Sequence, residues 1–241
     1  MQKILGYIRK AVLDFDLIQK GDWIAVGVSG GKDSLVLLAG LAQMRRFAEF
    51  DYDITAVTID PGFNGVPNNY EAVARLCEKL DVPFSLVHTQ IGEIVFDIRK
   101  EPNPCSLCAN MRRGALHDAA KAAGCNKLAR GHNNDDVIET FIMNLFNEGR
   151  IGCFSPKPHL DRKDITVIRP LVLAPESQVL SACNRNGFEI VKSVCPADKT
   201  TTRQKTKEFL RDMEHKDKGF KLRMFTALRK SGVDGWGYPD K

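Results

Sequence analysis

The residues best suited to chemistry form a short stretch, Ser-Gly-Gly-Lys-Asp-Ser, at positions 29–34. Adjacent glycines let the backbone approach an anion closely, and Lys32 adds a mobile positive charge for phosphate oxygens. The hydroxyls of Ser29 and Ser34 can donate hydrogen bonds, and Asp33 can help to hold a magnesium ion. If a helix starts here, its unpaired N–H groups and the positive end of its dipole also face the anion. The stretch therefore predicts a phosphate-binding loop.

Two common phosphate motifs do not fit this stretch. In a Walker A loop the first glycine would stand at Val26, and Ser or Thr would follow the lysine where Asp33 stands. G-x-G-x-x-G is absent as well. S-G-G-x-D-S after a strand instead resembles the motif of the PP-loop ATP pyrophosphatases. That resemblance implies cleavage of ATP between the α and β phosphates, with AMP transferred to an acceptor oxygen. The plain alternative is an ordinary strand-to-helix turn.

A second chemical feature is the C-x-x-C formed by Cys105 and Cys108, which we expect in a proline-bounded loop just before a helix. Two thiols at this spacing can bind one metal ion, and a helix N-terminus favours their thiolate forms. A redox pair, half of a zinc site and part of an iron–sulfur site are all compatible with it. Cys195, outside any helical apolar stripe, is the best candidate for a third ligand. The residues alone leave a three-cysteine metal site and two unrelated thiol features as open alternatives.

The elements that must position these residues alternate along the chain. The apolar run 23–28 predicts a buried strand before the phosphate loop, and a helix follows the loop to about residue 47. Alternating strands and helices predict an α/β fold with a mostly parallel, twisted sheet covered by helices on both faces. The further predicted strands are 54–60, 84–88, 127–130 and 165–168, with a short extended piece at 187–191. The further predicted helices are 2–19, 67–80, 109–123, 135–147, 175–186, 201–215 and 217–230.

Composition bounds the class of protein. The 241 residues are 43% hydrophobic, which supports a core, and no apolar run approaches the length of a membrane-spanning helix. The start of the chain has no long apolar region of the kind found in signal peptides, so we expect a cytoplasmic protein. Seven cysteines, an odd number, make a disulfide framework an unsuitable interpretation.

Positive charge is concentrated near the C-terminus. Residues 199–230 contain 11 Lys and Arg residues against 4 Asp and Glu residues, although the whole chain carries only +5. This basic segment predicts either a surface for a polyanionic partner or a solvated helix face. We expect an ATP-pyrophosphatase domain at 1–198, including the N-terminal helix and cysteine loop, and a basic helical extension at 199–241.

Four motifs in order resemble those of the tRNA 2-thiocytidine synthetase (TtcA-type) family. They are the phosphate loop 29–34, the C-x-x-C followed by Met-Arg-Arg-Gly-Ala-Leu at 111–116, the G-H-x-x-D-D at 131–136 and the R-P-L at 169–171. The resemblance covers about residues 1–200. It implies a PP-loop, adenine nucleotide alpha-hydrolase-like fold, ATP-dependent activation of a tRNA base, and sulfur insertion. It also implies a [4Fe–4S] cluster held by Cys105, Cys108 and Cys195.

The resemblance implies a role for each candidate residue. Adenylation makes the carbonyl oxygen of the base a good leaving group, and Lys32, the loop amides and Mg²⁺ stabilise charge on the phosphates. Asp33 or Asp136 is the candidate for holding Mg²⁺. Each of the remaining candidates for binding ATP has an alternative role. Asp60 either reaches the ribose or caps its own turn, and Arg169 either neutralises a phosphate or pairs with a carboxylate. His132 either contacts the nucleotide or the base, or forms a hydrogen bond within its own loop. The full ATP-binding set is Ser29, Gly30, Gly31, Lys32, Asp33, Ser34, Asp60, Gly131, His132 and Arg169, and the candidate tRNA-binding set is Arg112, Arg113, Arg203, Lys205, Lys207 and Arg211.

Three cysteines leave one iron of a four-iron cluster without a protein ligand, so our hypothesis is that the cluster carries sulfur rather than electrons. The expected partners are tRNA and a sulfur donor, either a cysteine desulfurase or inorganic sulfide; no membrane is expected, and a homodimer is left open. One alternative is a PP-loop sulfurtransferase for another tRNA position or a small molecule. Relatives that thiolate uridine-type bases usually carry zinc-finger C-x-x-C pairs at both ends, which this sequence lacks. The other alternative is a non-catalytic iron–sulfur or nucleotide sensor on the same fold.

Overall fold

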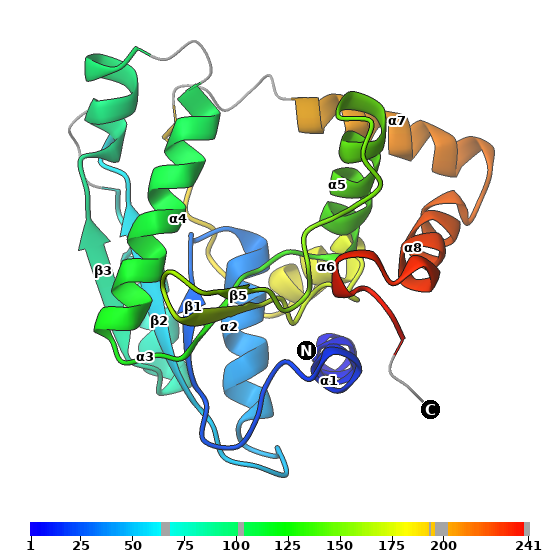
Figure 1. Ribbon diagram of the computed structural model, residues 1–241. Coiled ribbons are helices and arrows are strands. Elements are labelled where there is room, and N and C mark those ends of the chain that lie inside the picture. Colours follow the sequence, from blue (N-terminus) through cyan, green and yellow to red (C-terminus); the bar gives the residue numbers. More distant parts are fainter. Residues whose placement is uncertain (64–67, 101–103, 193, 196–201, 239–241) are drawn as a thin grey trace.

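The computed structural model of the chain describes residues 1–63, 68–100, 104–192, 194–195 and 202–238. A twisted sheet forms the centre, and helices cover both of its faces (Figure 1). Helices near the C-terminus lie beyond α5, away from β3 (Figure 1). The mostly parallel α/β architecture predicted from the sequence is confirmed.

The sheet has the strand order β3-β2-β1-β4-β6-β5. All neighbours pair in parallel except β5, which pairs antiparallel with β6 at the edge. The order reverses beside β1, and in open α/β sheets ligands bind at the carboxyl ends of the strands next to such a reversal. The strands are β1 (Trp23–Gly27), β2 (Asp53–Asp60), β3 (Phe84–His88), β4 (Lys127–Ala129), β5 (His159–Leu160) and β6 (Ile165–Ile168).

Side chains that alternate between the two faces of the central strands divide the hydrophobic core into two layers. Ile24 and Val26 of β1 pack into the larger hydrophobic cluster, whereas Ala25 packs into the cluster on the opposite face. Successive side chains of a strand point to opposite faces of the sheet, so a strand buried on both faces contributes to both layers. The larger cluster is covered by α1 (Gln2–Phe15), α2 (Lys32–Met44), α3 (Glu71–Leu80) and α6 (Glu176–Arg185), and the opposite cluster by the π-helix η2 (Glu93–Ile98) and α4 (Pro104–Ala122).

Three differences from the predicted elements matter for the site. Helix α4 begins at Pro104 rather than at residue 109, because proline suits the first turn of a helix. The short strand β5 lies inside the predicted loop 149–164; two residues are too few to show periodicity. Residues 187–191 form no strand among the described residues, and the Val191 N–H instead donates to the Gly30 carbonyl at 3.0 Å.

The C-terminal helices pack against α5 (Asn134–Asn147) and reach the start of the chain. They are α7 (Thr202–Lys216) and α8 (Phe220–Ser231), followed by the short η3 (Val233–Gly235). Trp236 is fully buried, with its ring 5.6 Å from Phe15 and 5.7 Å from Phe225. Arg229, also buried, contacts Asp14 at 3.2 Å. The predicted domain boundary at 198/199 lies outside the described residues and remains a prediction.

Candidate functional site

The phosphate loop connects β1 to α2 as predicted, and its own serines shape it. The Ser34 hydroxyl donates to the Gly31 carbonyl at 2.9 Å and accepts from the Ser29 N–H at 3.2 Å. Gly30 has φ +81°, and a side chain there would meet the Cβ of Val191 at 2.6 Å. Since Gly31 is the N-cap of α2, the free amides of the first helical turn point out of the loop.

The ammonium of Lys32 is held by two carboxylates from different helices. It lies 2.8 Å from Asp33 Oδ2 and 3.0 Å from Glu176 Oε1. The same Glu176 carboxylate also forms an ion pair with the ammonium of Lys207 on α7, at 2.7 Å. These bonds raise the pKa of Lys32 despite its burial, so the side chain is charged at neutral pH. Glu176 was not among the predicted site residues.

Two aspartates face the cavity beside the loop and share one partner. The Asn133 side chain donates to Asp33 Oδ1 at 2.9 Å, and the Asn133 N–H donates to Asp136 Oδ2 at 2.9 Å. Asn133 also caps α5, which is why the sequence Asn-Asn-Asp-Asp places Asp136 here. Burial and the charge of Asp33 raise the pKa of Asp136. Two carboxylates that lie side by side are suited to a divalent cation, which prefers oxygen ligands.

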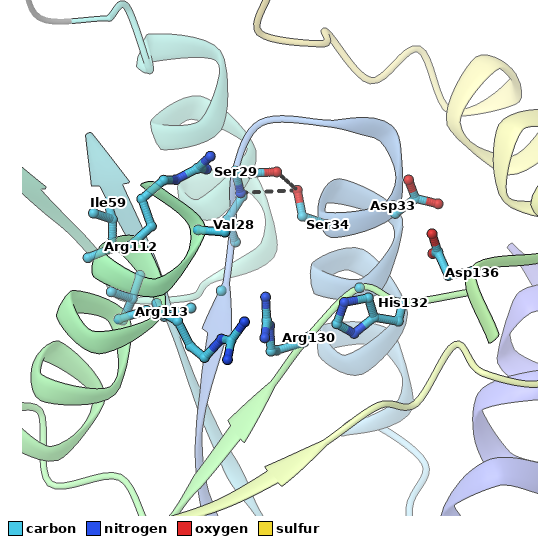
Figure 2. A pocket seen from close by; sticks show the side chains of 15 residues that line it. Val28, Ser29, Asp33, Ser34, Ile59, Arg112, Arg113, Arg130, His132 and Asp136 are labelled. Atoms are coloured by element: carbon cyan, nitrogen blue, oxygen red, sulfur yellow. Dashed lines mark hydrogen bonds between the residues drawn. The ribbon is translucent and has the colours of Figure 1, made fainter. Parts of the chain in front are cut away.

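A cavity of about 380 Å³ opens between these residues and α4 (Figure 2). Arg112 and Arg113 enter it from α4, and Arg130 enters from the end of β4. Burial, followed by the charges of Arg113 and Arg112, lowers the pKa of Arg130 to about 10. Because guanidinium groups crowded together repel one another, an anion in this cavity gains from all three. Arg130 was not among the predicted site residues; its position directly after a strand was the available signal.

The G-H-x-x-D-D segment lies directly on the phosphate loop. A Cβ on Gly131 would come within 3.0 Å of the Asp33 backbone carbon, so glycine permits the close approach. His132 lines the cavity, and its ring lies 4.8 Å from that of Phe154. Arg169 does not line the cavity; its Nε–H donates to His132 Nδ1 at 3.1 Å.

Asp60 lies outside the cavity lining, and its carboxylate is occupied. It accepts hydrogen bonds from the Gly62 N–H at 3.2 Å and from the Asn68 side chain at 3.0 Å, and lies 3.1 Å from His88 Nδ1. This arrangement corresponds to the turn-capping alternative, and its ribose contact stays a prediction.

The cysteine pair lies on the first two turns of α4 instead of in a loop before it. Residues three apart share a helix face, so Cys105 and Cys108 lie on the same side of α4. Cys195 packs against the hydrophobic cluster that contains Cys108. Burial is the main cause of the raised pKa of Cys108, and the nearby thiols of Cys195 and Cys105 add to it. The three predicted ligands are therefore neighbours.

Arg112 connects the thiols with the cavity. It hydrogen-bonds Cys108, which partly offsets the rise in the pKa of that thiol. The two residues are four positions apart on the helix, about 6 Å along its axis. A second hollow of about 230 Å³ is lined by Arg112, by Ser29 and Gly31 of the phosphate loop, and by Val194 next to Cys195. Within the described residues, no three His, Cys, Asp or Glu side chains are already arranged to hold a metal ion. The donor chemistry of three thiols, two of them at the start of α4, nevertheless fits iron–sulfur ligation.

The predicted tRNA-binding residues of α7 fall into two groups, one paired with carboxylates beside the phosphate loop and one exposed to solvent. Arg203 lies 3.1 Å from Asp136 and Lys207 lies 2.7 Å from Glu176, so both point at the phosphate site. Lys205 and Arg211 are exposed. The helical spacing of these residues, with apolar Leu210 buried between α7 and α5, explains the division.

The buried carboxyl group of Glu139 makes the free energy of unfolding depend on pH. Burial and then the charge of Asp136 raise its pKa from 4.5 to about 7. Between these values the unfolded chain has lost this proton and the folded chain has not, so stability falls as pH rises and is constant above pH 7. We expect Glu139→Gln to match the wild type near pH 4.5 and to exceed it at pH 8 by up to about 3 kcal/mol. Urea unfolding of both proteins at the two pH values measures this. The prediction would be contradicted if the variant and the wild type differed in their free energy of unfolding by the same amount at both.

No helix within the described ranges combines the length and apolar character needed to cross a membrane.

Comparison with known proteins gives consistent results. A family model described as a PP-loop domain matches residues 5–213. The tRNA-cytidine(32) 2-sulfurtransferase of Pelobacter propionicus is 40% identical over 224 residues, covering 92% of this chain and 82% of that protein. The protein of the same name from Citrifermentans bemidjiense is 37% identical over 230 residues, covering 94% and 89%.

Among solved structures, the chain resembles the U34-tRNA thiolase NcsA from Methanococcus maripaludis with its [4Fe-4S] cluster. The TM-score is 0.78 at 26% identity, covering 95% of this chain and 78% of that one. A phosphoadenylyl-sulfate reductase from Candida auris shares the fold, with a TM-score of 0.50 at 13% identity.

Proposed function

Because the chain belongs to the PP-loop family, we propose that it is a tRNA sulfurtransferase that uses ATP to form 2-thiocytidine. The observation that carries the proposal is the adjacency of three parts: a phosphate loop, a cavity lined by arginines and two carboxylates, and a trio of cysteines about one helical turn beyond Arg112. Phosphate binding, base activation and sulfur delivery each need one of these parts, and they adjoin along α4.

In the first step, the C2 carbonyl oxygen of the base attacks the α-phosphorus of ATP, the bond to the β-phosphate breaks, and pyrophosphate leaves. The loop amides and Lys32 would bind the departing phosphates, and Arg113 and Arg130, which line the cavity, would neutralise charge there. Asp33 and Asp136 would hold Mg²⁺, which would withdraw further charge from the phosphates. A nucleophilic sulfur then bonds to C2, and AMP departs with the former carbonyl oxygen.

Cys105, Cys108 and Cys195 would hold a [4Fe–4S] cluster, which would supply sulfur for C2 when bound. Arg112 donates to the Cys108 thiol and also lines the cavity, so it lies between the thiols and the phosphates. We propose that it contacts both this sulfur and the substrate, and that its charge opposes the rise in the pKa of the thiol that burial causes. The direct sulfur donor is a cysteine desulfurase or inorganic sulfide, and the reaction takes place in the cytoplasm with its tRNA.

The tRNA would contact the exposed face of α7 as well as Arg112 and Arg113. Since each phosphate contact releases counterions, we expect tRNA affinity to fall about 10³-fold or more between 50 and 200 mM salt if at least six contacts form. Lys205→Ala with Arg211→Ala should weaken binding and flatten the slope, whereas Lys10→Ala on α1 should change neither. Filter binding against salt measures this, and a flat wild-type response would remove nucleic acid from the proposal.

The proposal is tested with protein purified under anaerobic conditions, ATP, a sulfide source and unmodified tRNA. Pyrophosphate release that depends on tRNA separates an enzyme from a nucleotide sensor. Mass spectrometry of the nucleosides then identifies the product: 2-thiocytidine supports the proposal. A thiolated uridine at position 34 would instead favour the reaction named for the structurally similar U34-tRNA thiolase. Pyrophosphate release without RNA would indicate a small-molecule acceptor.

A further inference from the structure

Arg169 determines which nitrogen of His132 carries the proton. Its Nε–H points to His132 Nδ1 at 3.1 Å, while its Nη1 donates to the carbonyl oxygen of Ser155 and its guanidinium carbon lies 4.8 Å above the ring of Phe154. An arginine has donors only, so Nδ1 must accept through its lone pair. The proton of a neutral His132 ring therefore sits on Nε2.

The surroundings keep this ring neutral. A second proton would have to enter at Nδ1, where the Arg169 donor already lies. Burial, followed by the charges of Arg130, Arg169, Arg203 and Arg113, lowers the pKa of His132 well below its ordinary value. These arginines belong to four separate segments: the ends of β4 and β6, and the helices α7 and α4. Asp33 and Asp136 line the same cavity with negative charge but do not reverse the shift.

The ring is also fixed in place. Phe154 packs on it at a centroid distance of 4.8 Å and an interplanar angle of 31°. Phe154 in turn lies against the buried Trp236, whose ring also packs on Phe15 of α1. His132 lines the cavity beside Arg130 and the phosphate loop.

We propose that His132 is a fixed, neutral hydrogen-bond donor that gives its Nε2–H to a phosphate oxygen of the bound nucleotide, and that Arg169 is the residue that positions it. The inference rests on the proposed function insofar as the cavity takes ATP. His132 then transfers no proton during the reaction and stabilises phosphate charge only, which suits a ring surrounded by cations. Arg169 acts through His132 and does not itself touch the nucleotide.

The tautomer can be tested in the free protein. Two-bond ¹H–¹⁵N correlation of the full chain resolves the five histidines, with His132 assigned by its absence in His132→Gln. We expect the Nε2–H pattern for His132, unchanged from pH 5.5 to 8. Arg169→Met should release Nδ1, so the ring populates both tautomers or titrates. Arg203→Met, which removes a neighbouring charge without touching the ring, should keep the Nε2–H pattern. An Nδ1–H or charged ring in the wild type would overturn the inference.

The donor role is tested with α,β-methylene ATP, which cannot release pyrophosphate. Its binding should move the His132 Nε2–H proton signal downfield, and His132→Gln and Arg169→Met should each weaken its affinity about tenfold by calorimetry, the worth of one such hydrogen bond. Binding without any change at Nε2–H would overturn the donor role. If the wild type fails to bind the analogue, the proposed ATP function and the donor role both fall, whereas the tautomer is decided by the free protein.

Discussion

Lys32→Met is expected to lower tRNA-dependent pyrophosphate release by about 10²–10³-fold, the usual cost of removing one donor that stabilises transition-state charge. Lys32 follows the glycines of the phosphate loop, and its ammonium is held at 2.8 Å from Asp33 and 3.0 Å from Glu176. A charge fixed in this way needs no reorganisation when the β-phosphate departs. The loss should be mainly in kcat, because the loop amides still bind the ground state.

Lys121→Met is the matched control for this prediction. Lys121 also pairs with an aspartate, lying 3.3 Å from Asp164, but it stands on the last turn of α4, away from the cavity. Its replacement should leave pyrophosphate release within about twofold, in line with the small worth of an exposed ion pair. The assay measures initial rates over a range of ATP concentrations. A Lys32→Met enzyme with wild-type kcat would remove Lys32 from the chemistry.

Glu176 and Lys207 extend this arrangement to α7. The Glu176 carboxylate lies between the loop lysine and Lys207, so the helix that carries predicted tRNA contacts is bonded directly to the phosphate site. RNA phosphates that attract Lys207 would compete with Glu176 for it. The ion pairs of α7 thus connect the phosphate loop with the predicted tRNA contacts through side chains.

Much of this site could be predicted because its residues are contiguous in sequence. The phosphate loop, the Asn-Asn-Asp-Asp helix start and the strands β2, β3 and β6 each show their local pattern of glycines, caps or β-branched residues. Local patterns fail where pairing is long-range. Glu176 opens a helix after Pro175 and reads as an ordinary acidic first turn; only the packing of α6 beside α2 brings it to Lys32.

The roles of single polar residues were harder to predict than the elements that carry them. Arg169 follows a strand and was expected to meet a phosphate or a carboxylate, yet it is buried against Phe154 and bonds a histidine. Its partner is 37 positions away in sequence, and a strand end offers several polar neighbours. The C-x-x-C was expected in a loop because Pro102 and Pro104 precede it, but a proline at the first helical position starts α4 instead.

Cys108→Ala is expected to lower iron and acid-labile sulfide in protein purified under anaerobic conditions at least tenfold and to abolish thiolation. Cys108 is the buried member of the trio, and its thiol interacts with those of both Cys105 and Cys195, so its removal leaves the two outer thiols without the central ligand. Loss of one ligand should cost more than the roughly 10- to 100-fold in metal affinity that follows loss of a residue supporting a ligand. Binding of α,β-methylene ATP should persist, because the phosphate loop is untouched.

Cys125→Ala separates this effect from a general weakening of the core. Cys125 is buried in the same hydrophobic cluster as Cys108, but it follows α4 and stands apart from the trio. Both replacements remove one buried sulfur and should destabilise the fold to a similar extent, about 1–2 kcal/mol by the usual cost of a core truncation of this size. Only Cys108→Ala should lose iron. Equal iron contents in the two variants would place the metal elsewhere, and the link between the thiols and sulfur delivery would have to be abandoned.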